Sequence, residues 1–325
     1  MEDKALQVGA AVLTLALLLR LGGTWSRGQE ELGRTLLFLS SGRLVTETLP
    51  SETEADPGPV PAEPVEEAAA VPVFGESEES FVQVNAAWEV DVLPLLEEPL
   101  QWNLRADAPT VLILHSHATE SYTKSKGESY KESSDYRTLN ENYNMLSIGA
   151  YLEEKLKEGG LGVVHAKDLH DYPSYSGSYV NSRKTVQAYL KKYPTIQLVL
   201  DLHRDAADDG FGGQMDTSAT VDGKESARLM MVVGTNAGGM NHPNWEDNLA
   251  LAMKLHVVLE KRFPGLCRTI SFRKQRFNQD LSPGALLIEV GAAGNTHAEA
   301  LVAADALARG ILELARGSAT SDSAG

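Results

Sequence analysis

The sequence predicts an α/β domain in which a mostly parallel sheet is covered by helices on both faces. Short apolar runs, typical of buried strands, alternate along the chain with amphipathic stretches of helical period. This alternation continues through most of the chain after Asp107. It favours parallel strands joined by crossover helices, because parallel neighbours need a long connection between them.

The predicted elements follow one another closely. In the first part of the domain, strands are expected at 110–114, 161–165 and 196–201, and helices at 144–157 and 181–192. Gly159 and Gly160 would end the first of these helices, because glycine commonly follows the last helical turn. Further on, strands are expected at 228–233 and 285–289, and helices at 245–262 and from 297 to about 316. The domain is therefore predicted at 81–317.

The chain begins with an apolar run from Ala5 to Leu19 that is followed by Arg20. A run of this length can be a signal sequence, a short membrane-spanning helix or a buried helix of the domain. No Ala-x-Ala-like cleavage motif follows it, which favours an uncleaved membrane anchor at 1–27. Basic residues lie on both sides of the run, so charge counting leaves its orientation open.

An acidic, proline-rich segment follows the expected anchor. Residues 44–104 contain 14 of the 45 acidic residues and no Lys or Arg, so the rest of the chain has 31 acidic and 29 basic residues. Low apolar content, like charges and frequent proline predict a mostly disordered linker at 28–80, and the polar tail at 318–325 is also expected to be disordered. The net charge of −16 argues against nucleic-acid binding, which needs clustered Lys and Arg.

Three predicted strands lead into side chains that can carry chemistry. These are His115, His117 and Glu120 after the first strand, Asp201, His203 and Arg204 at the end of the third, and Glu289 at the end of the last. Ligands bind beyond the carboxyl ends of strands in open α/β sheets, so these groups should meet at one edge. Cys267 is the only cysteine, so a metal must use His and carboxylate ligands. Two His, one carboxylate and a separate Glu are typical of hydrolytic zinc sites.

Each of these groups also has a structural interpretation. A single His at a strand end is more often hydrogen-bonded than bound to metal, and Glu120 could cap a helix or face solvent. The stretch from Asp201 to Asp205 could form an ion-pair cluster. Glu289 differs from these, because it closes an apolar run where an unpaired carboxylate would be costly. It should therefore have a charged partner or a metal-bound water.

Four long motifs occur in order between residues 108 and 315. They are Leu112-Ile-Leu-His-Ser-His-Ala-Thr-Glu-Ser-Tyr122, His170-Asp-Tyr-Pro-Ser-Tyr-Ser-Gly-Ser-Tyr179, Leu200-Asp-Leu-His-Arg-Asp-Ala206 and Phe277-Asn-Gln-Asp-Leu-Ser-Pro-Gly-Ala-Leu-Leu-Ile-Glu-Val-Gly291. In these motifs the chain resembles the stage II sporulation protein P family. Members of that family are membrane-anchored peptidoglycan hydrolases related to zinc N-acetylmuramoyl-L-alanine amidases, so the resemblance implies an amidase-like domain.

The resemblance also implies roles for single residues. His117 and His203 fall where the metal-binding histidines lie, and Glu289 falls on the catalytic glutamate. For the carboxylate ligand of Zn²⁺, the sporulation family's motif indicates Glu120, whereas the wider amidases would indicate Glu141. Glu120 is the expected ligand and Glu141 its rival, because the stretch His117-Ala-Thr-Glu-Ser121 is the more distinctive match. His115 and Arg204 would then line the pocket, and Arg204 would grip a peptide carboxylate or an oxyanion.

The activity that the resemblance implies is cleavage of the amide between muramic acid and L-alanine, with endopeptidase cleavage of peptide cross-links as a second activity. The expected setting is the engulfing septal membrane of a spore-forming cell, with the catalytic domain outside the membrane. Peptidoglycan and the companion stage II sporulation proteins D and M are the expected partners. The rival hypotheses are a catalytically silent wall-binding module and a scaffold protein of the engulfment complex.

Overall fold

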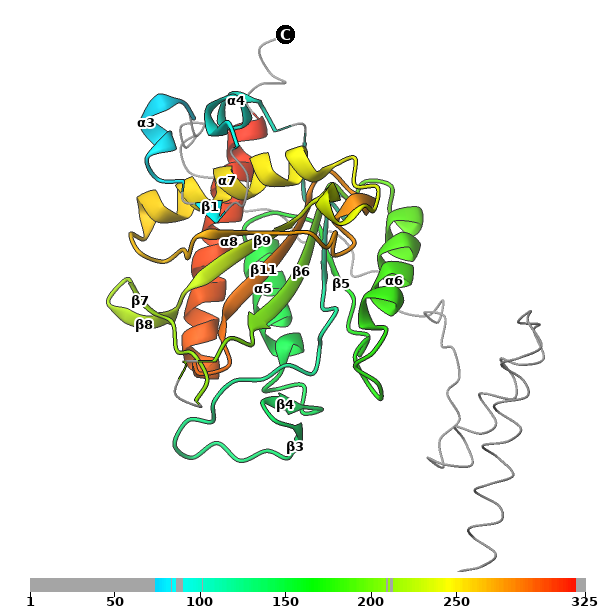
Figure 1. The fold of residues 1–325 in the computed structure, drawn as a ribbon, viewed down its shortest axis with the longest axis vertical. Coiled ribbons are helices and arrows are strands. Elements are labelled where there is room, and N and C mark those ends of the chain that lie inside the picture. The colour runs from blue at the N-terminus through cyan, green and yellow to red at the C-terminus, as the bar shows by residue number, and fades with distance from the viewer. Residues whose placement is uncertain are drawn as a thin grey trace, which may run out of the picture. The chain divides into compact units, whose positions relative to one another are not determined.

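A seven-stranded sheet forms the centre of the domain (Figure 1). The computed structural model describes residues 74–319 except 83, 86–89, 101, 209 and 211–212. The predicted anchor at 1–27, residues 28–73 of the predicted linker and residues 320–325 of the predicted tail lie outside the described residues. In the described part of the chain, no helix is both long and apolar enough to span a membrane.

The sheet is mostly parallel, as the sequence predicted. Its strands lie in the order β1 (Val84–Asn85), β10 (Ile270–Arg273), β9 (Leu229–Gly234), β11 (Ala285–Ala292), β6 (Leu198–Asp205), β2 (Val111–Leu114) and β5 (Val163–His165). Every neighbouring pair is parallel except β11 and β9, which are antiparallel. The strands β11, β6 and β2 are adjacent and parallel, so their carboxyl ends do meet at one edge.

Two strands run further than their local sequence predicted. The expectation that β6 ends at Asp201 is wrong, because the strand continues to Asp205. Likewise β11 continues past Glu289 to Ala292. Each pairs with the other along this extension, as Glu289 lies opposite His203 and Ala292 opposite Asp205. The pairing of β6 with β11 therefore keeps polar residues such as His203 and Glu289 inside the strands, although their polarity alone predicted that the strands would end.

Three helices cover one face of the sheet. They are α5 (Met145–Glu158), α7 (Trp245–Arg262) and α8 (His297–Ala319). Alternate strand residues, among them Ile113, Leu200, Ile288 and Val290, join these helices in one large apolar cluster. The bounds of α7 match the prediction, since an apolar stripe and the following Pro264-Gly265 mark both the helix and its end.

The other face is covered by one helix, α6 (Ser178–Lys192), which lies to one side of the sheet in Figure 1. The smaller cluster beneath it contains Leu112, Leu114, Val199 and Ala285 from the strands and Val186 from the helix. A second small cluster, built on Met230, Val232 and Leu287, lies on the same face by strand alternation. We call this the α6 face and the opposite one the sealed face.

Several short elements were not expected from the sequence. They are α3 (Glu76–Glu79), α4 (Val92–Glu97), the strands β1 and β10, the hairpin of β3 (Glu132–Ser134) with β4 (Arg137–Thr138), the hairpin of β7 (Ser218–Val221) with β8 (Lys224–Ala227), and the 3₁₀ turns η1 (Asn236–Gly238) and η2 (Gln279–Leu281). The helices α3 and α4 contact α7 through Lys261, which pairs with Glu78, and Lys254, which donates to the Leu95 carbonyl. Tertiary contacts hold these elements, since they are too short to show a clear period.

Candidate active site

Strand register places the two central side chains of the site next to each other. His203 of β6 lies directly opposite Glu289 of β11, and Asp201 lies opposite Leu287. Successive residues of a strand point to opposite faces, so Asp201, His203 and Glu289 all lie on the α6 face. The candidate site therefore begins as a row of polar groups across two adjacent parallel strands.

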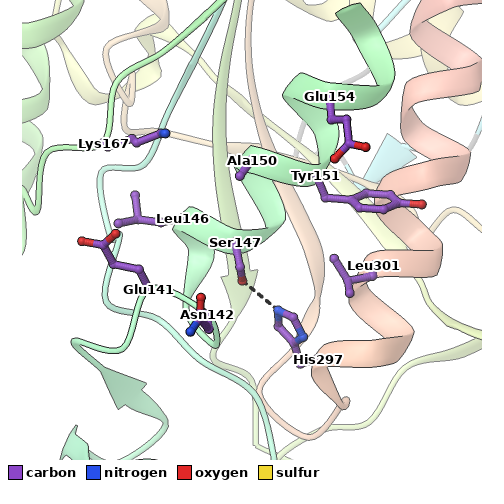
Figure 2. Close-up of a pocket in the computed structure, with 10 residues that line it drawn as sticks. All are labelled: Glu141, Asn142, Leu146, Ser147, Ala150, Tyr151, Glu154, Lys167, His297 and Leu301. Atoms are coloured by element: carbon purple, nitrogen blue, oxygen red, sulfur yellow. Dashed lines mark hydrogen bonds between the residues drawn. The ribbon is translucent and has the colours of Figure 1, made fainter. Parts of the chain in front are cut away.

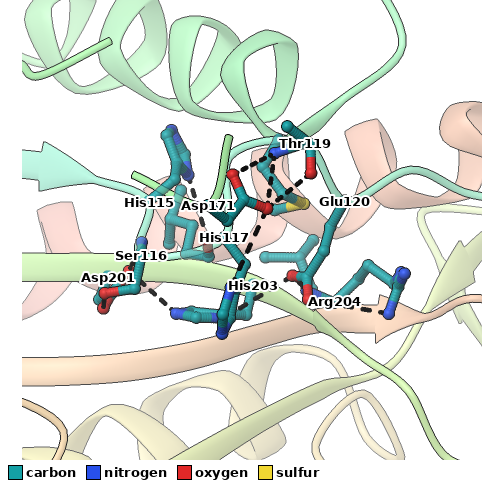
Figure 3. Close-up of polar contacts among 12 residues, drawn as sticks. His115, Ser116, His117, Thr119, Glu120, Asp171, Asp201, His203 and Arg204 are labelled. Atoms are coloured by element: carbon teal, nitrogen blue, oxygen red, sulfur yellow. Dashed lines mark hydrogen bonds and ion pairs between the residues drawn. The ribbon is translucent and has the colours of Figure 1, made fainter. Parts of the chain in front are cut away.

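The loop after β2 brings His117 and Glu120 to this row (Figure 3). Ser116 fixes the start of the loop, because its backbone N–H and its hydroxyl donate to the two oxygens of Asp201 at 2.7 and 2.6 Å. The ring of His117 then lies 5.3 Å from that of His203, at an interplanar angle of 82°. Glu120 Oε2 lies 3.7 Å from His203 Nδ1. The structure thus gathers His117, Glu120 and His203, as predicted.

The two histidines differ in their electrostatic surroundings. Burial lowers the pKa of His117 to about 4, so its imidazole is neutral at pH 7. Its Nδ1 has no hydrogen-bond partner. Burial also disfavours the charged form of His203, but the carboxylate of Asp201, 2.9 Å from Nε2, outweighs that effect and raises the pKa to about 9. Asp201 therefore lies beside Nε2 of His203, and Nδ1 of the same ring faces Glu120.

Glu289 carries a strongly perturbed carboxyl group. Burial raises its pKa to about 8, and the positive charge of His203 only partly opposes this rise. Its Oε2 atom is buried and has no hydrogen-bond partner. The sequence predicted a charged partner or a metal-bound water for this carboxylate, and an unsatisfied buried oxygen leaves room for such a ligand.

Arg137 and Asp171 complete the polar network, and sequence reasoning assigned them no role. Arg137, on β4, donates to Glu120 Oε1 at 3.1 Å and to Asp171 Oδ2 at 2.7 Å. Asp171 also accepts a hydrogen bond of 2.6 Å from the Thr119 hydroxyl. The guanidinium lies 4.8 Å from the ring centre of Tyr175, which stacks on His117 at 4.5 Å. Asp171 and Tyr175 belong to a quoted motif, but nothing in the local sequence singles out Arg137.

Arg204 is used mainly to hold the loop that follows Glu120. Its side chain is buried, and it donates from Nε to the Ser121 carbonyl at 3.0 Å and from Nη2 to the Tyr136 carbonyl at 2.9 Å. Its backbone N–H donates to Glu120 Oε2 at 3.2 Å. Nη1 alone makes no hydrogen bond and lies 3.8 Å from Glu120 Oε1. Nη1 is thus the one guanidinium nitrogen that is buried without a hydrogen-bond partner among the described residues.

His115 does not line the site, so that expectation is wrong. The strand alternation that places Ile113 on the sealed face carries His115 to the same side. There its Nε2 lies 2.8 Å from His165 Nε2, and its Nδ1 lies 3.1 Å from the Leu202 carbonyl oxygen. Gly149 of α5 makes room for this pair, because a Cβ at that position would lie 2.5 Å from His115 Nε2.

The rival carboxylate Glu141 lies elsewhere. It is exposed and helps line a hollow of about 410 Å³ between α5 and α8 (Figure 2). In that hollow the Ser147 hydroxyl and His297 Nε2 are 2.7 Å apart. The structure therefore places Glu120, and not Glu141, beside His203.

The described residues contain no group of three or more His, Cys, Asp and Glu side chains arranged to hold a metal ion. The donor types are nevertheless those of a zinc site, with a neutral His117, a second His and a carboxylate within a few ångströms. The buried, unpartnered Nδ1 of His117 fits such an ion. Arg137 and the Arg204 amide now hold the two oxygens of Glu120, so a metal would have to share or replace one of these contacts.

Comparison with known proteins identifies the family. The family model for stage II sporulation protein P matches residues 51–312. The chain belongs to the stage II sporulation protein P family. Over 214 residues it is 32% identical to the stage II sporulation protein P of Bacillus subtilis (strain 168), which covers 62% of this chain and 50% of that relative. The chain thus spans half the length of that relative.

Solved structures of amidases are also similar to parts of this chain. An N-acetylmuramoyl-L-alanine amidase from Clostridium difficile 630 is 16% identical, with 67% of this chain and 100% of that chain covered and a TM-score of 0.37. The amidase Ami1 from Mycobacterium abscessus is 12% identical, with 66% and 98% covered and a TM-score of 0.38.

Proposed function

We propose that this protein is a zinc-dependent peptidoglycan hydrolase, which cleaves the amide between N-acetylmuramic acid and L-alanine and, as a second activity, peptide cross-links. The observation that carries the proposal is the register pair of His203 and Glu289, which lies beside His117 and Glu120. Family membership supports the same activity. In this proposal His117, Glu120 and His203 hold the metal, and Glu289 is the catalytic base.

Each group would have its own part in the reaction. A bound zinc ion would polarise the scissile carbonyl and acidify the attacking water. Glu289 would take the proton from that water and return it to the nitrogen of the leaving amine. A pKa of about 8 suits both transfers near neutral pH. Asp201 would keep His203 in one orientation, as carboxylates beside ligating histidines do. Arg204 Nη1 would contact the substrate.

We also propose the cellular setting. The segment at 1–27 anchors the protein in the membrane, the linker at 28–80 spaces the domain from it, and the domain acts outside the membrane on the septal wall during engulfment. Peptidoglycan is the substrate, and the stage II sporulation proteins D and M are the partners. These assignments rest on the apolar amino-terminal run and on the family.

Substitution of the base provides the first test. The full 325-residue chain and its Glu289→Gln variant are incubated with purified sacculi, and released peptides are identified by mass spectrometry. We expect free L-alanine amino termini from the wild type and a rate at least roughly 10²-fold lower from the variant, because loss of general acid–base catalysis has about that effect. Release at the wild-type rate by Glu289→Gln would contradict the role of Glu289. Binding of sacculi with no release by the wild type would favour a silent wall-binding module.

Zinc content provides the second measurement. We expect close to one zinc per chain in the wild type and in Glu289→Gln, and little in Glu120→Gln. Glu141→Gln is the matched control, because Glu141 is exposed and lines another hollow. A protein that is free of metal and indifferent to chelators would contradict the proposal.

A further inference from the structure

Tyr179 lies beside the polar row of the site, although nothing above gives it a role. Its ring is edge-on to His117, with 5.4 Å between centroids and an angle of 88°. It is nearly parallel to the ring of His203, at 6.2 Å and 12°. Tyr179 is therefore the aromatic residue that contacts both histidines of the proposed metal site in the described structure.

The strands beneath Tyr179 place it on the same face as Glu289. Tyr179 packs against the small cluster of Met230, Val232 and Leu287. Leu287 is two residues before Glu289 in β11, and Met230 of β9 lies directly opposite Glu289. Residues two apart share a face of a strand, so the tyrosine covers the sheet next to the catalytic carboxyl group.

The backbone around Tyr179 is held firmly. Gly177, with a φ of +91°, allows the chain to turn into α6 two residues earlier. The Asn278 amide donates to the Tyr179 carbonyl at 2.8 Å, and both Phe277 and Asn278 adopt left-handed backbone conformations, with φ of 48° and 61°. Such conformations in non-glycine residues persist where surrounding contacts enforce them. Phe277 in turn packs on the tyrosine ring at 5.6 Å.

The phenol hydroxyl is uncommitted. Its hydroxyl makes no hydrogen bond with any described residue, since those at Tyr179 involve the backbone carbonyl. A phenol is neutral at pH 7, and its O–H group can donate a hydrogen bond.

We propose that Tyr179 is a further catalytic residue, whose hydroxyl donates a hydrogen bond to the carbonyl oxygen of the scissile amide as that oxygen becomes negatively charged. This inference rests on the proposed hydrolase function. Donors that are fixed before the reaction stabilise a developing oxyanion strongly, because they need no reorganisation. Arg204 is less suited to this task, since it offers only Nη1 from a side chain that already holds two loop carbonyls.

The step balances without a new reactant. Water adds to the amide carbon and its proton goes to Glu289, the carbonyl oxygen gains charge and accepts the hydrogen bond from Tyr179, and the carbon–nitrogen bond then breaks. The proton returns from Glu289 to the leaving nitrogen. Tyr179 keeps its own proton throughout.

The test compares Tyr179→Phe with the wild type in the full chain. Phenylalanine keeps the ring contacts with His117 and His203 and removes only the hydroxyl. With a soluble disaccharide-peptide prepared from peptidoglycan as substrate, we expect kcat to fall by roughly 10²- to 10³-fold, the loss typical for one oxyanion donor. KM and zinc content should stay close to wild type. Tyr172→Phe is the matched control, because Tyr172 belongs to the same motif, is 43% exposed and contacts neither histidine.

Three results would overturn the inference, and they differ in what else they affect. An active wild type with a Tyr179→Phe variant that retains more than half of its kcat would remove the hydroxyl from catalysis and leave the proposed function intact. A fall in kcat that follows a matching loss of zinc would make Tyr179 a structural residue. A wild type that releases no peptide would overturn the proposed function, and the role of Tyr179 with it.

Discussion

The two faces of the sheet use the same strands for different purposes. The sealed face presents Ile113, Leu200 and Ile288 to α5, α7 and α8, and these side chains are fully buried. The α6 face presents Asp201, His203 and Glu289 from two of these strands, β6 and β11, under a single helix. Successive residues of β6 and β11 point to opposite faces of the sheet, so neighbouring residues of each strand belong alternately to the core and to the site.

The difference shows what each face requires. Apolar side chains need only close packing, which three helices supply. The polar groups of the α6 face must be satisfied one by one, because a buried charge without a partner is costly. The loop after β2 provides such a partner through Ser116, which donates to Asp201, and the β3–β4 hairpin provides one through Arg137, which donates to Glu120. Stability should therefore depend on the volume of the buried apolar side chains on the sealed face and on charge pairing on the α6 face.

Removal of Arg137 should produce the largest loss of stability. Arg137→Ala leaves Glu120 and Asp171 as buried carboxylates without their shared partner, and breaking such an arrangement typically destabilises a protein by about 3 to 5 kcal/mol. Urea unfolding at pH 7 measures the change. Arg105→Ala is the control, because that arginine pairs with Asp107 on the exposed surface and should contribute less than about 1 kcal/mol. Equal losses for the two variants would contradict the importance of charge pairing on the α6 face.

A cavity in the sealed face should act on stability alone. Ile288→Ala removes a fully buried side chain one residue before Glu289, and we expect a loss of about 2 to 5 kcal/mol in urea unfolding. Ile288→Val should lose about 0.5 to 1.5 kcal/mol. Peptide release per folded molecule should remain near the wild-type rate in both variants. If Ile288→Val lowered that rate tenfold, the two faces would not be separable.

The buried lysine of α7 should give stability a pH dependence that does not involve the site. Burial lowers the pKa of Lys254 from 10.5 to about 8. The unfolded chain therefore binds a proton between about pH 8 and 10.5 that the folded chain does not, so this lysine makes stability rise with pH across that window. One pKa unit corresponds to about 1.4 kcal/mol, so the fall from 10.5 to about 8 gives a rise of roughly 3.5 kcal/mol over the whole window.

Lys254→Met tests this assignment. In the variant, the free energy of unfolding should no longer rise with pH by the amount that Lys254 contributes. Urea unfolding at pH 8 and at pH 10 measures this difference. Lys157→Met is the control, because Lys157 lies on the outer surface of α5 and pairs with Glu153. If Lys254→Met and the wild type had the same pH dependence, the proton would belong to another group.

The sequence by itself determined the α/β class, the position of most strands and helices, and the convergence of His117, Glu120, His203 and Glu289. Local periodicity and turn residues carry this information, and parallel strands bring their carboxyl ends together whatever the details of packing. The four motifs added the family, which the match over residues 51–312 confirmed.

Only the tertiary structure decided which way each group faces and what it contacts. It placed His115 on the sealed face, extended β6 and β11 past their apolar cores, and turned β9 antiparallel to β11. It also brought Arg137 from a polar hairpin to Glu120, and Tyr179 from the start of α6 to His203. These contacts join segments far apart in the chain, and they depend on register and packing, which no local pattern of residues encodes.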